Sequence, residues 1–228
     1  MKKHFFIAGT DTDAGKTLLA TALLLAANRR GLRTIGLKPV AAGCEPTADG
    51  LRNGDALQLQ AAASVRLSYD QVNPVALEPA IAPHIAAERA GRRLSGDRLA
   101  AYCRGAMLHG ADLVVVEGAG GWRVPLNRRE TLACVPQRLA LDVILVVGMK
   151  LGCINHALLT AEAIARDGLR LVGWVANQVD PEMSCVEENL ATLEALLRAP
   201  LLGRIPWLAA PDPAQVANRL DLDRLLNG

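Results

Sequence analysis

Aromatic residues are scarce in this chain. Phe, Trp and Tyr make up 3% of its 228 residues, against 51% hydrophobic residues in total, so aliphatic side chains have to fill the core. The formal net charge is only +2, which gives no broad basic face and does not favour a nucleic-acid partner. The four histidines are scattered, and the five cysteines include no C-x-x-C pair, standing at positions 44, 103, 134, 153 and 185. This spacing favours free thiols in a reducing compartment over a zinc site or a disulfide framework.

Long hydrophobic runs are also missing. One of the longest, LLATALLLAA at residues 18–27, falls far short of a membrane span. The opening MKKHFFIAG carries two lysines, but its apolar run is shorter than the core of a signal peptide and passes straight into a glycine-containing loop. We therefore expect a cytoplasmic protein that has no membrane partner.

Short continuous apolar runs alternate with helical segments along the chain. Such runs are typical of a parallel sheet in an α/β fold, with helices covering both faces. We expect strands at residues 4–9, 33–39, 112–121, 142–148, 169–177 and 200–206, and helices at residues 15–30, 55–63, 96–109, 154–167, 184–198 and from about 214. Residues 40–54 are expected to form a loop, and residues 64–94 an irregular segment. There is no internal repeat or linker, and the length suits one unit, so residues 1–228 are predicted to form a single domain.

The sequence GTDTDAGKT at residues 9–17 resembles the phosphate-binding pattern G-x-x-x-x-G-K-[ST] with one residue too many. It follows a predicted strand and opens a predicted helix, which is the context that a phosphate-binding loop requires. Backbone N–H groups and the helix dipole favour an anion there, Lys16 can reach the terminal phosphates, and the Thr17 hydroxyl suits Mg²⁺. We therefore predict a P-loop NTPase-like fold. The extra residue and the two carboxylates, Asp11 and Asp13, need a chemical reason in a loop that holds phosphate.

Three further side chains stand where a ligand of this loop would bind. Glu117 ends the apolar run VVVE and is followed by GAGG, whose small residues allow a ligand to approach the backbone closely. With Thr17 it would complete a Mg²⁺ site. Lys38 also ends a strand, and it either faces the same phosphates or is simply exposed. Asp55 begins a helix, where it serves either as the N-cap or as a third acidic group near the metal, and spacing alone does not choose between these alternatives.

The order and spacing of several motifs resemble dethiobiotin synthetase over about residues 5–208. These motifs are GTDTDAGKT, KPVAAG, GLRNGDAL, VNP, PHIAA, VEGAGGWRVPL, ILVVGMKLGCINHALLT, GWVAN and PLLGRIPWL. Members of that family close the ureido ring of dethiobiotin in biotin biosynthesis. 7,8-Diaminononanoate captures CO₂ as a carbamate, ATP phosphorylates the carbamate to a carbamic-phosphoric anhydride, and the second amine displaces phosphate. The resemblance therefore implies a Mg²⁺-dependent ligase whose small-molecule substrates are the diamine, CO₂ and ATP.

The resemblance also assigns roles to individual residues. Lys16 and Lys38 are expected to be catalytic, because they would stabilise charge on the carbamate and the γ-phosphate. Mg²⁺ is expected to bind Thr17, Asp55 and Glu117. The nucleotide is expected to contact the loop, the glycine-rich turn and two later segments, namely Asp13, Ala14, Gly15, Lys16, Thr17, Leu18, Asp55, Glu117, Gly118, Ala119, Gly120, Asn177, Gln178, Ile205, Pro206 and Trp207. The diamine is expected to contact Thr12, Lys38, Ala42 and, across the interface of a homodimer, Gly152, Cys153, Ile154 and Asn155.

One position departs from the family pattern, which commonly has a hydroxyl residue where this chain has Ala42. A hydroxyl there would add a hydrogen bond worth about 0.5–1.5 kcal/mol. Its absence points to weaker substrate binding, a water in its place, or a changed substrate.

The ring-closing chemistry gives a reason for the acidic loop. The free diamine is largely cationic near neutral pH, and a loop carboxylate can hold an ammonium group or a metal-bound water beside the γ-phosphate. The extra residue would leave space for a small acceptor. On this hypothesis, Asp13→Ala impairs turnover more than nucleotide binding.

Two other classes of protein share parts of this pattern. Amidating ligases related to the cobyrinate and cobyrate amidotransferases have a similar ATP domain followed by a glutaminase domain, for which we expect no room in 228 residues. Partitioning and cell-division ATPases typically carry a second lysine early in the loop, as in K-G-G-x-G-K-[ST], where this chain has acids. We therefore expect neither activity.

Overall fold

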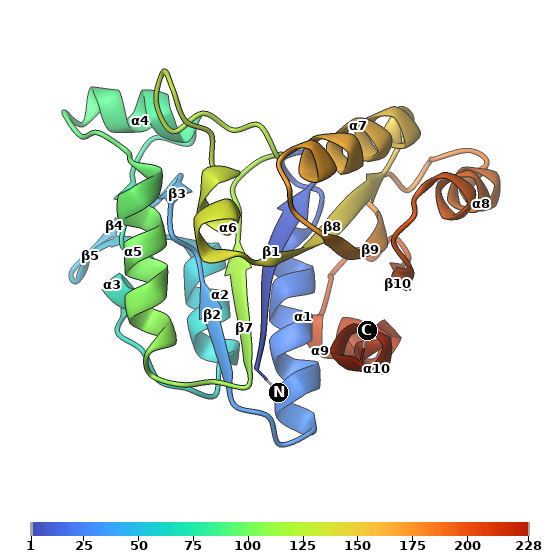
Figure 1. The fold of residues 1–228 in the computed structure, drawn as a ribbon, viewed down its shortest axis with the longest axis horizontal. Coiled ribbons are helices and arrows are strands. Elements are labelled where there is room, and N and C mark those ends of the chain that lie inside the picture. Colours follow the sequence, from blue (N-terminus) through green and yellow to red (C-terminus); the bar gives the residue numbers. More distant parts are fainter. Residues whose placement is uncertain (1, 228) are drawn as a thin grey trace.

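A six-stranded parallel sheet lies at the centre of the computed structural model, which describes residues 2–227 (Figure 1). Its strands lie in the order β10-β9-β8-β1-β7-β2, and every pair of neighbours is parallel. Their bounds are Lys3–Gly9 for β1, Thr34–Leu37 for β2, Leu113–Glu117 for β7, Asp142–Met149 for β8, Leu171–Gln178 for β9 and Leu201–Ile205 for β10. In β1, Phe6 lies opposite Val116 of β7 on one side and Val143 of β8 on the other. The predicted parallel α/β sheet is confirmed.

Alternate side chains of the strands point into two cores, one on each face of the sheet. In β7, Val114 and Val116 belong to one core, whereas Leu113 and Val115 belong to the other. The first core is covered by α5, α6, α7 and α8, and the second by α1, α9 and α10, with α2 beside α1 (Figure 1). These helices are α1 Lys16–Arg29, α2 Gly54–Ala62, α5 Gly96–Met107, α6 Cys134–Leu139, α7 Cys153–Arg166, α8 Val186–Leu196, α9 Pro213–Val216 and α10 Leu222–Asn227. Burial on both faces explains why the strands are continuous apolar runs in the sequence.

The segment between β2 and α5 contains more regular structure than the sequence predicts. Residues 40–54 hold β3 and a β4–β5 hairpin, and residues 64–94 hold α3, β6 and α4. Their bounds are β3 Ala41–Ala42, β4 Glu45–Thr47, β5 Gly50–Arg52, α3 Tyr69–Val72, β6 Ala76–Leu77 and α4 Pro83–Arg89. The prediction of a loop and an irregular segment is wrong here, because elements of two to seven residues are too short to show a hydrophobic period.

The predicted helix from about residue 214 is also wrong in detail. The chain instead forms α9, the 3₁₀ turn η1 at Ala217–Arg219 and α10. Leu220, between η1 and α10, is extended and bridges to Gly203 of β10, which interrupts the helix. The short helix α6 was not predicted at all. None of the helices between residues 2 and 227 is long and apolar enough to cross a membrane.

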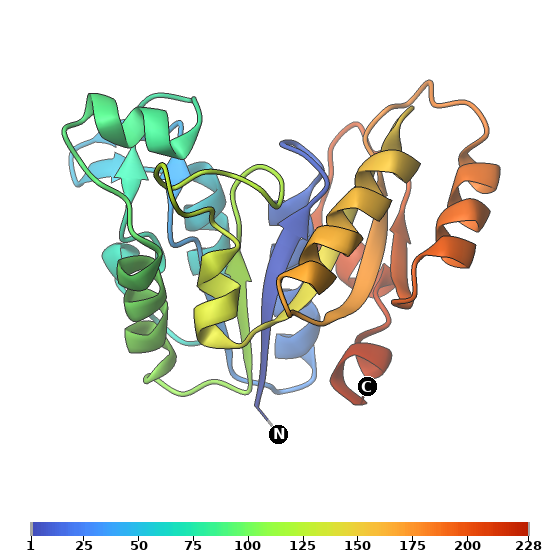
Figure 2. The same ribbon diagram turned by 45° about the horizontal axis from the view of Figure 1, so that its top comes forward.

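The carboxyl ends of the strands meet at one edge of the sheet. There, β1 leads into the loop at residues 9–17, β7 ends at Glu117, and β2 ends one residue before Lys38. Figure 2 shows α4 and the loop between β7 and α6 at this same edge. Open α/β sheets bind ligands at the carboxyl ends of their strands, so the fold brings the predicted site residues to the expected place.

Candidate active site

The loop at residues 9–17 is held in shape by a residue from β9. Gly15 has a φ of 97°, and a Cβ there would lie 2.1 Å from the amide nitrogen of Asn177. That amide donates a hydrogen bond to the carbonyl of Ala14 at 2.9 Å. The second glycine of the motif is therefore required both by its backbone angle and by the approach of Asn177. The amide of Asn177, which we expected to contact the base, is used here to support the loop.

The two acidic residues of the loop differ in their surroundings. The Asp11 carboxylate forms an ion pair with Lys150 at 3.0 Å and accepts the backbone N–H of Thr12 at 2.8 Å. The hydrogen bond from Lys150 lowers the pKa of Asp11. Asp13, with a φ of 58°, is exposed and lines the main cavity of the site. Of the two carboxylates, Asp13 is therefore the one placed to meet a substrate.

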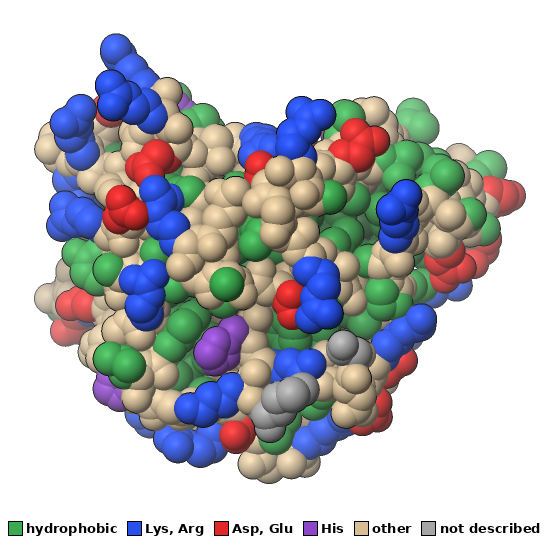
Figure 3. Space-filling view, in the orientation of Figure 1, with side chains coloured by type: hydrophobic (Ala, Val, Ile, Leu, Met, Phe, Trp, Pro, Cys, Tyr) green, Lys and Arg blue, Asp and Glu red, His purple; other side chains and the backbone are tan. Residues whose placement is uncertain are grey.

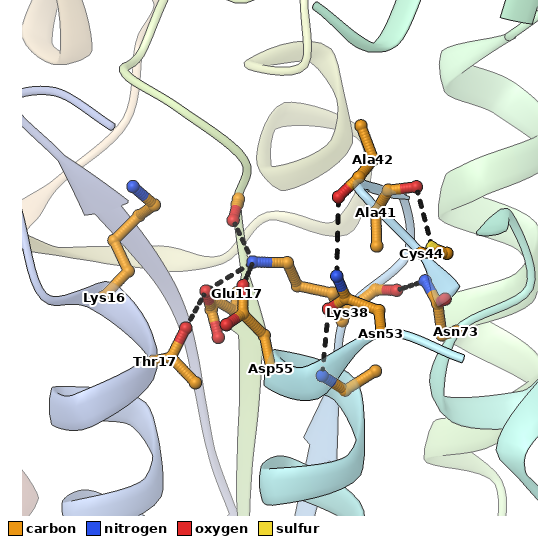
Figure 4. Close-up of polar contacts among 12 residues, drawn as sticks. Lys16, Thr17, Lys38, Ala41, Ala42, Cys44, Asn53, Asp55, Asn73 and Glu117 are labelled. Atoms are coloured by element: carbon orange, nitrogen blue, oxygen red, sulfur yellow. Dashed lines mark hydrogen bonds and ion pairs between the residues drawn. The ribbon is translucent and has the colours of Figure 1, made fainter. Parts of the chain in front are cut away.

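Lys16 is buried at the start of α1. Its Nζ donates to the backbone carbonyl of Asp11 at 3.0 Å, so the loop closes on its own lysine. Burial, and next the positive charge of Lys38, lower the pKa of Lys16. In Figure 4 the Lys16 amine lies apart from the carboxylates that surround Lys38. A nearby anion would relieve both unfavourable effects on Lys16, as expected for a phosphate ligand.

Lys38, Glu117 and Asp55 form a compact ionic cluster (Figure 4). The Lys38 Nζ lies 2.5 Å from Glu117 Oε1, 2.8 Å from Asp55 Oδ2 and 3.2 Å from the carbonyl of Gly118. Burial alone would lower the pKa of Lys38, but the charges of Glu117 and Asp55 outweigh it and raise that pKa. Burial likewise works against the ionised form of Asp55, and the charge of Lys38 overcomes it and lowers the pKa of Asp55. Lys38 and Asp55 are therefore charged near neutral pH, and Lys38 is not the exposed strand-end lysine of the alternative interpretation.

Asp55 does not cap α2. The N-cap is Asn53, whose side-chain oxygen accepts the backbone N–H of Ala56 at 3.2 Å. The backbone N–H of Asn53 donates to the hydroxyl of Tyr69 at 2.7 Å, which fixes the start of the helix. The N-cap alternative for Asp55 is wrong, and its carboxylate is free to face the Lys38 ammonium.

The residues predicted to bind Mg²⁺ lie together and suit that ion. The Thr17 hydroxyl donates to Glu117 Oε1 at 2.8 Å. Glu117 is 1% exposed, and its Oε2 is buried without a hydrogen-bond partner among the described residues. Residues 2–227 contain no cluster of three or more His, Cys, Asp or Glu side chains that could enclose a metal. Two carboxylates, one of them with an orphaned buried oxygen, and a hydroxyl match Mg²⁺, which takes few protein ligands and completes its shell with phosphates and water.

These side chains border a cavity of about 840 Å³. Its lining includes the phosphate-binding loop and the ionic cluster, with Thr12, Asp13, Gly15, Lys16, Thr17, Leu18, Lys38, Asp55 and Glu117. It also includes a set of apolar residues, namely Ala41, Ala42, Ala80, Ile81, Ala82, Pro83, Val124 and Pro125. Ala42, which replaces the family's common hydroxyl residue, also accepts the Asn53 amide on its carbonyl at 3.4 Å. The cavity can hold a nucleotide phosphate chain beside a partly aliphatic acceptor.

A separate hollow of about 370 Å³ collects most of the residues predicted to contact the base. It is lined by Gln178, Ile205 and Pro206, together with apolar residues such as Met149 and Leu190. Trp207 stands next to it in sequence and is 46% exposed. The hollow brings together segments that are about thirty residues apart, because β9 and β10 are neighbours in the sheet.

The segment Gly152–Asn155 does not line the main cavity of its own chain. It forms the start of α7, where Leu151 is 94% exposed and Leu159 is 56% exposed. Hydrophobic side chains gather on this side of the molecule in Figure 3, over α7 and toward α8, whereas Lys and Arg gather over α4. This geometry leaves the segment available to a neighbouring molecule.

Comparisons with known proteins identify the family. Residues 3–215 match a family model described as an AAA domain. A protein of Cellvibrio japonicus (strain Ueda107), named ATP-dependent dethiobiotin synthetase BioD, is 62% identical over 226 residues, which are 99% of each chain. The chain belongs to the dethiobiotin synthetase family. A member of the same name from Pseudomonas aeruginosa (strain UCBPP-PA14) is 61% identical over 218 residues, 96% of each chain.

The fold of this dethiobiotin synthetase family member is shared with solved structures of other proteins. A ParA family ATPase from Chlorobium tepidum TLS has a TM-score of 0.60 at 12% identity, covering 99% of this chain and 97% of its own. The septum site-determining protein MinD complexed with Mg-ADP, from Pyrococcus horikoshii OT3, has a TM-score of 0.56 at 15% identity, covering 98% and 89%. At these identities the likeness is one of fold alone, and it confirms the predicted P-loop NTPase-like fold.

Some parts of the dethiobiotin synthetase site were not predicted. The pairing of Lys150 with Asp11 joins residues 139 positions apart, and no local sequence signal announces it. The wall formed by Arg123, Val124 and Pro125 was likewise given no role. The cap at Asn53 could have been found, because Asn is as good an N-cap as Asp.

Proposed function

We propose that this protein makes dethiobiotin from 7,8-diaminononanoate, CO₂ and ATP, and that residues 1–228 act as one synthetase domain. Its membership of the dethiobiotin synthetase family supports the reaction. The observation that carries the proposal is the single cavity in which a phosphate-binding loop, two buried lysines and two carboxylates border a partly apolar space. That combination suits phosphoryl transfer to a small, largely aliphatic acceptor.

The first step joins an amine of the substrate to CO₂. The amine reacts in its neutral form and loses a proton as the carbamate appears, whereas the free diamine is mostly protonated. Asp13 lies at the cavity and carries no ion pair with Lys150, unlike Asp11. In this proposal Asp13 attracts the second, cationic amine and orients the diamine beside the γ-phosphate.

The second step moves the γ-phosphoryl group from ATP to a carbamate oxygen, which yields ADP and a carbamic-phosphoric anhydride. The backbone N–H groups of the loop and Lys16 bind the phosphates, and Lys38 stabilises negative charge on the carbamate and the transferred group. Thr17, Asp55 and Glu117 would hold Mg²⁺, and the ion would supply positive charge to the phosphate chain. The protein's part is to position the reactants and stabilise charge.

The third step closes the ring. The second amine releases the proton of its cationic form, and its neutral nitrogen attacks the carbonyl carbon of the anhydride. The bond to the phosphate oxygen breaks, inorganic phosphate leaves, and the nitrogen gives up a further proton to solvent. The apolar part of the cavity keeps the diamine chain in place during this step and limits access of water to the anhydride. Thr12 and Ala42 lie next to the reacting end of the substrate in this proposal.

The nucleotide base and the subunit interface complete the proposal. Gln178, Ile205, Pro206 and Trp207 bind the base, with Asn177 supporting the loop from below. Two copies associate through the exposed start of α7, so that Gly152–Asn155 of one copy reach the diamine in the other. The apolar exposure of Leu151 and Leu159 supports this homodimer.

The decisive experiment is product analysis by mass spectrometry. The purified protein is incubated with 7,8-diaminononanoate, bicarbonate, Mg²⁺ and ATP, and each component is omitted in turn. We expect dethiobiotin to appear in a one-to-one ratio with ADP, and only when all components are present. Formation of ADP without dethiobiotin would reject the proposed acceptor and direct attention to Ala42.

A further inference from the structure

The loop after β7 forms a wall of the main cavity and rests on the phosphate-binding loop. Residues 119–121 and 123–125 line the cavity. A Cβ on Gly121 would lie 3.6 Å from the carbonyl oxygen of Thr10, and one on Gly120 would lie 3.7 Å from the hydroxyl of Thr12. The position of this wall therefore sets the width of the cavity next to the phosphate-binding loop.

One carboxylate from a distant part of the chain binds the middle of this wall. Asp167, the residue that follows α7, accepts the indole N–H of Trp122 at 2.8 Å. It also accepts two bonds from the guanidinium of Arg123, at 2.6 and 3.0 Å. The Asp167 side chain is 13% exposed and that of Arg123 is 48% exposed, so the carboxylate is largely buried while water reaches the guanidinium. Three hydrogen bonds to one carboxylate, two of them in a bidentate pair, define the direction of two consecutive wall residues.

The bonds of Asp167 to Trp122 and Arg123 form a clamp, which is itself held in place from both sides. Trp122 is buried and meets the ring of Phe6 edge to face, with the ring centres 6.0 Å apart. Phe6 also lies beneath the start of the wall, because a Cβ on Gly118 would lie 3.0 Å from its ring. On the other side, the Gln137 amide of α6 donates to the backbone carbonyl of Asp167 at 2.9 Å. Asp167 is therefore fixed to a helix while it holds the wall.

We propose that Asp167 is a positioning residue that sets the acceptor side of the cavity through Trp122 and Arg123. This inference rests on the proposed function. Asp167 does not line the cavity, so its effect passes through the wall it holds. The wall residues that follow the clamp in sequence, Val124 and Pro125, are apolar and line the cavity. Loss of the clamp therefore affects the diamine more than the nucleotide.

The test compares Asp167→Asn with a matched control in steady-state assays of dethiobiotin formation. Asparagine keeps the shape but removes the charge and replaces one acceptor with a donor. We expect the KM for the diamine to rise about tenfold, which corresponds to the loss of one charge-assisted hydrogen bond, with the KM for ATP changed less than threefold. Asp142→Asn is the control, since Asp142 makes a similar bidentate pair with Arg170, at 2.9 and 2.6 Å, and does not line the cavity. Its kinetic constants should stay unchanged.

A second variant separates positioning from general stability. Arg123→Gln removes the bidentate pair but leaves the bond between Trp122 and Asp167, so it should raise the diamine KM less than Asp167→Asn. The double variant should be no worse than Asp167→Asn, because both changes break the same clamp. Additive effects, or an unchanged diamine KM in Asp167→Asn, would overturn the inference. If Asp167→Asn fails to fold, an unchanged diamine KM in Arg123→Gln overturns it instead. Absence of dethiobiotin with the unmodified protein would instead reject the proposed function.

Discussion

Replacement of Lys38 by Met is the most informative perturbation of the ionic cluster. The Lys38 side chain is 5% exposed and that of Glu117 is 0% exposed, so both charges of this pair lie out of water. Methionine keeps much of the lysine volume but removes the ammonium group. Glu117 then keeps the hydrogen bond from the Thr17 hydroxyl but loses the positive charge of Lys38 that neutralised it. The carboxylate of Asp55 still lies nearby.

The size of the effect follows from the burial of the pair. Removal of one partner from a buried ion pair costs about 3–5 kcal/mol, because the other charge is left uncompensated. Asp55 contributes less to this cost, since its side chain is 42% exposed and water can screen it. We therefore expect Lys38→Met to lower the free energy of unfolding by about 3 kcal/mol, the lower end of that range.

Urea denaturation with and without Mg²⁺ measures this effect. In EDTA the variant should show the full loss of unfolding free energy. Excess MgCl₂ should restore part of that free energy, because the ion binds the carboxylates that no longer pair with Lys38. Mg²⁺ should stabilise the unmodified protein less, since Lys38 already occupies those oxygens. Arg30→Met provides the control, because it breaks an ion pair in which the side chain of Arg30 is 40% exposed and that of Asp223 is 74% exposed. This change should lower the free energy of unfolding by less than about 1 kcal/mol.

Two results would refute this reasoning. An unfolding free energy within about 0.5 kcal/mol of the unmodified protein in EDTA would show that the pair contributes as little as a surface pair. Equal stabilisation of both proteins by Mg²⁺ would show that the ion does not compete with Lys38 for the carboxylates. The double variant Lys38→Met/Glu117→Gln should recover stability, because no buried charge is left without a partner.

Three further predictions concern the same site. Asp13→Ala should lower kcat by tenfold or more, roughly the scale of a lost charge-assisted contact, with little change in ATP affinity measured by calorimetry; loss of ATP binding with normal turnover would contradict it. Lys16→Met should abolish ATP binding yet raise the unfolding free energy of the ligand-free protein. This gain follows because the lowered pKa of Lys16 means that its charge opposes folding at every pH below its ordinary value, and a drop in stability would contradict it. The lowered pKa of Asp55 makes a stabilising contribution that is present above its ordinary value of 3.8 and is lost as the pH falls through the folded-state value. Urea denaturation at a series of acidic pH values should therefore show that the unfolding free energy of Asp55→Asn falls less steeply with pH than that of the unmodified protein. Equal slopes for the two proteins would count against the ion pair of Asp55 with Lys38.

Much of the architecture follows from local features of the sequence. Strands such as LVVV before Glu117 are buried on both faces, so they are continuous apolar runs that mark a parallel sheet. The loop at residues 9–17 carries its own signal, because only certain residue types permit its backbone and bind phosphate. Residues 40–52 and 64–94 resisted prediction because elements such as β3, β6 and α4 are too short for a period and owe their form to packing.

Sequence by itself determined the parallel sheet, the phosphate-binding loop and the family to which the chain belongs, because each is expressed in runs or motifs of adjacent residues. Tertiary structure alone decided which groups meet. Lys38 and Glu117 are 79 positions apart, and their contact depends on β2 and β7 being neighbours in the sheet. Asp167 reaches Trp122 over 45 positions through the end of α7. Such contacts depend on the order of the strands and on the docking of the helices, and neither can be inferred from the separation of two residues along the chain.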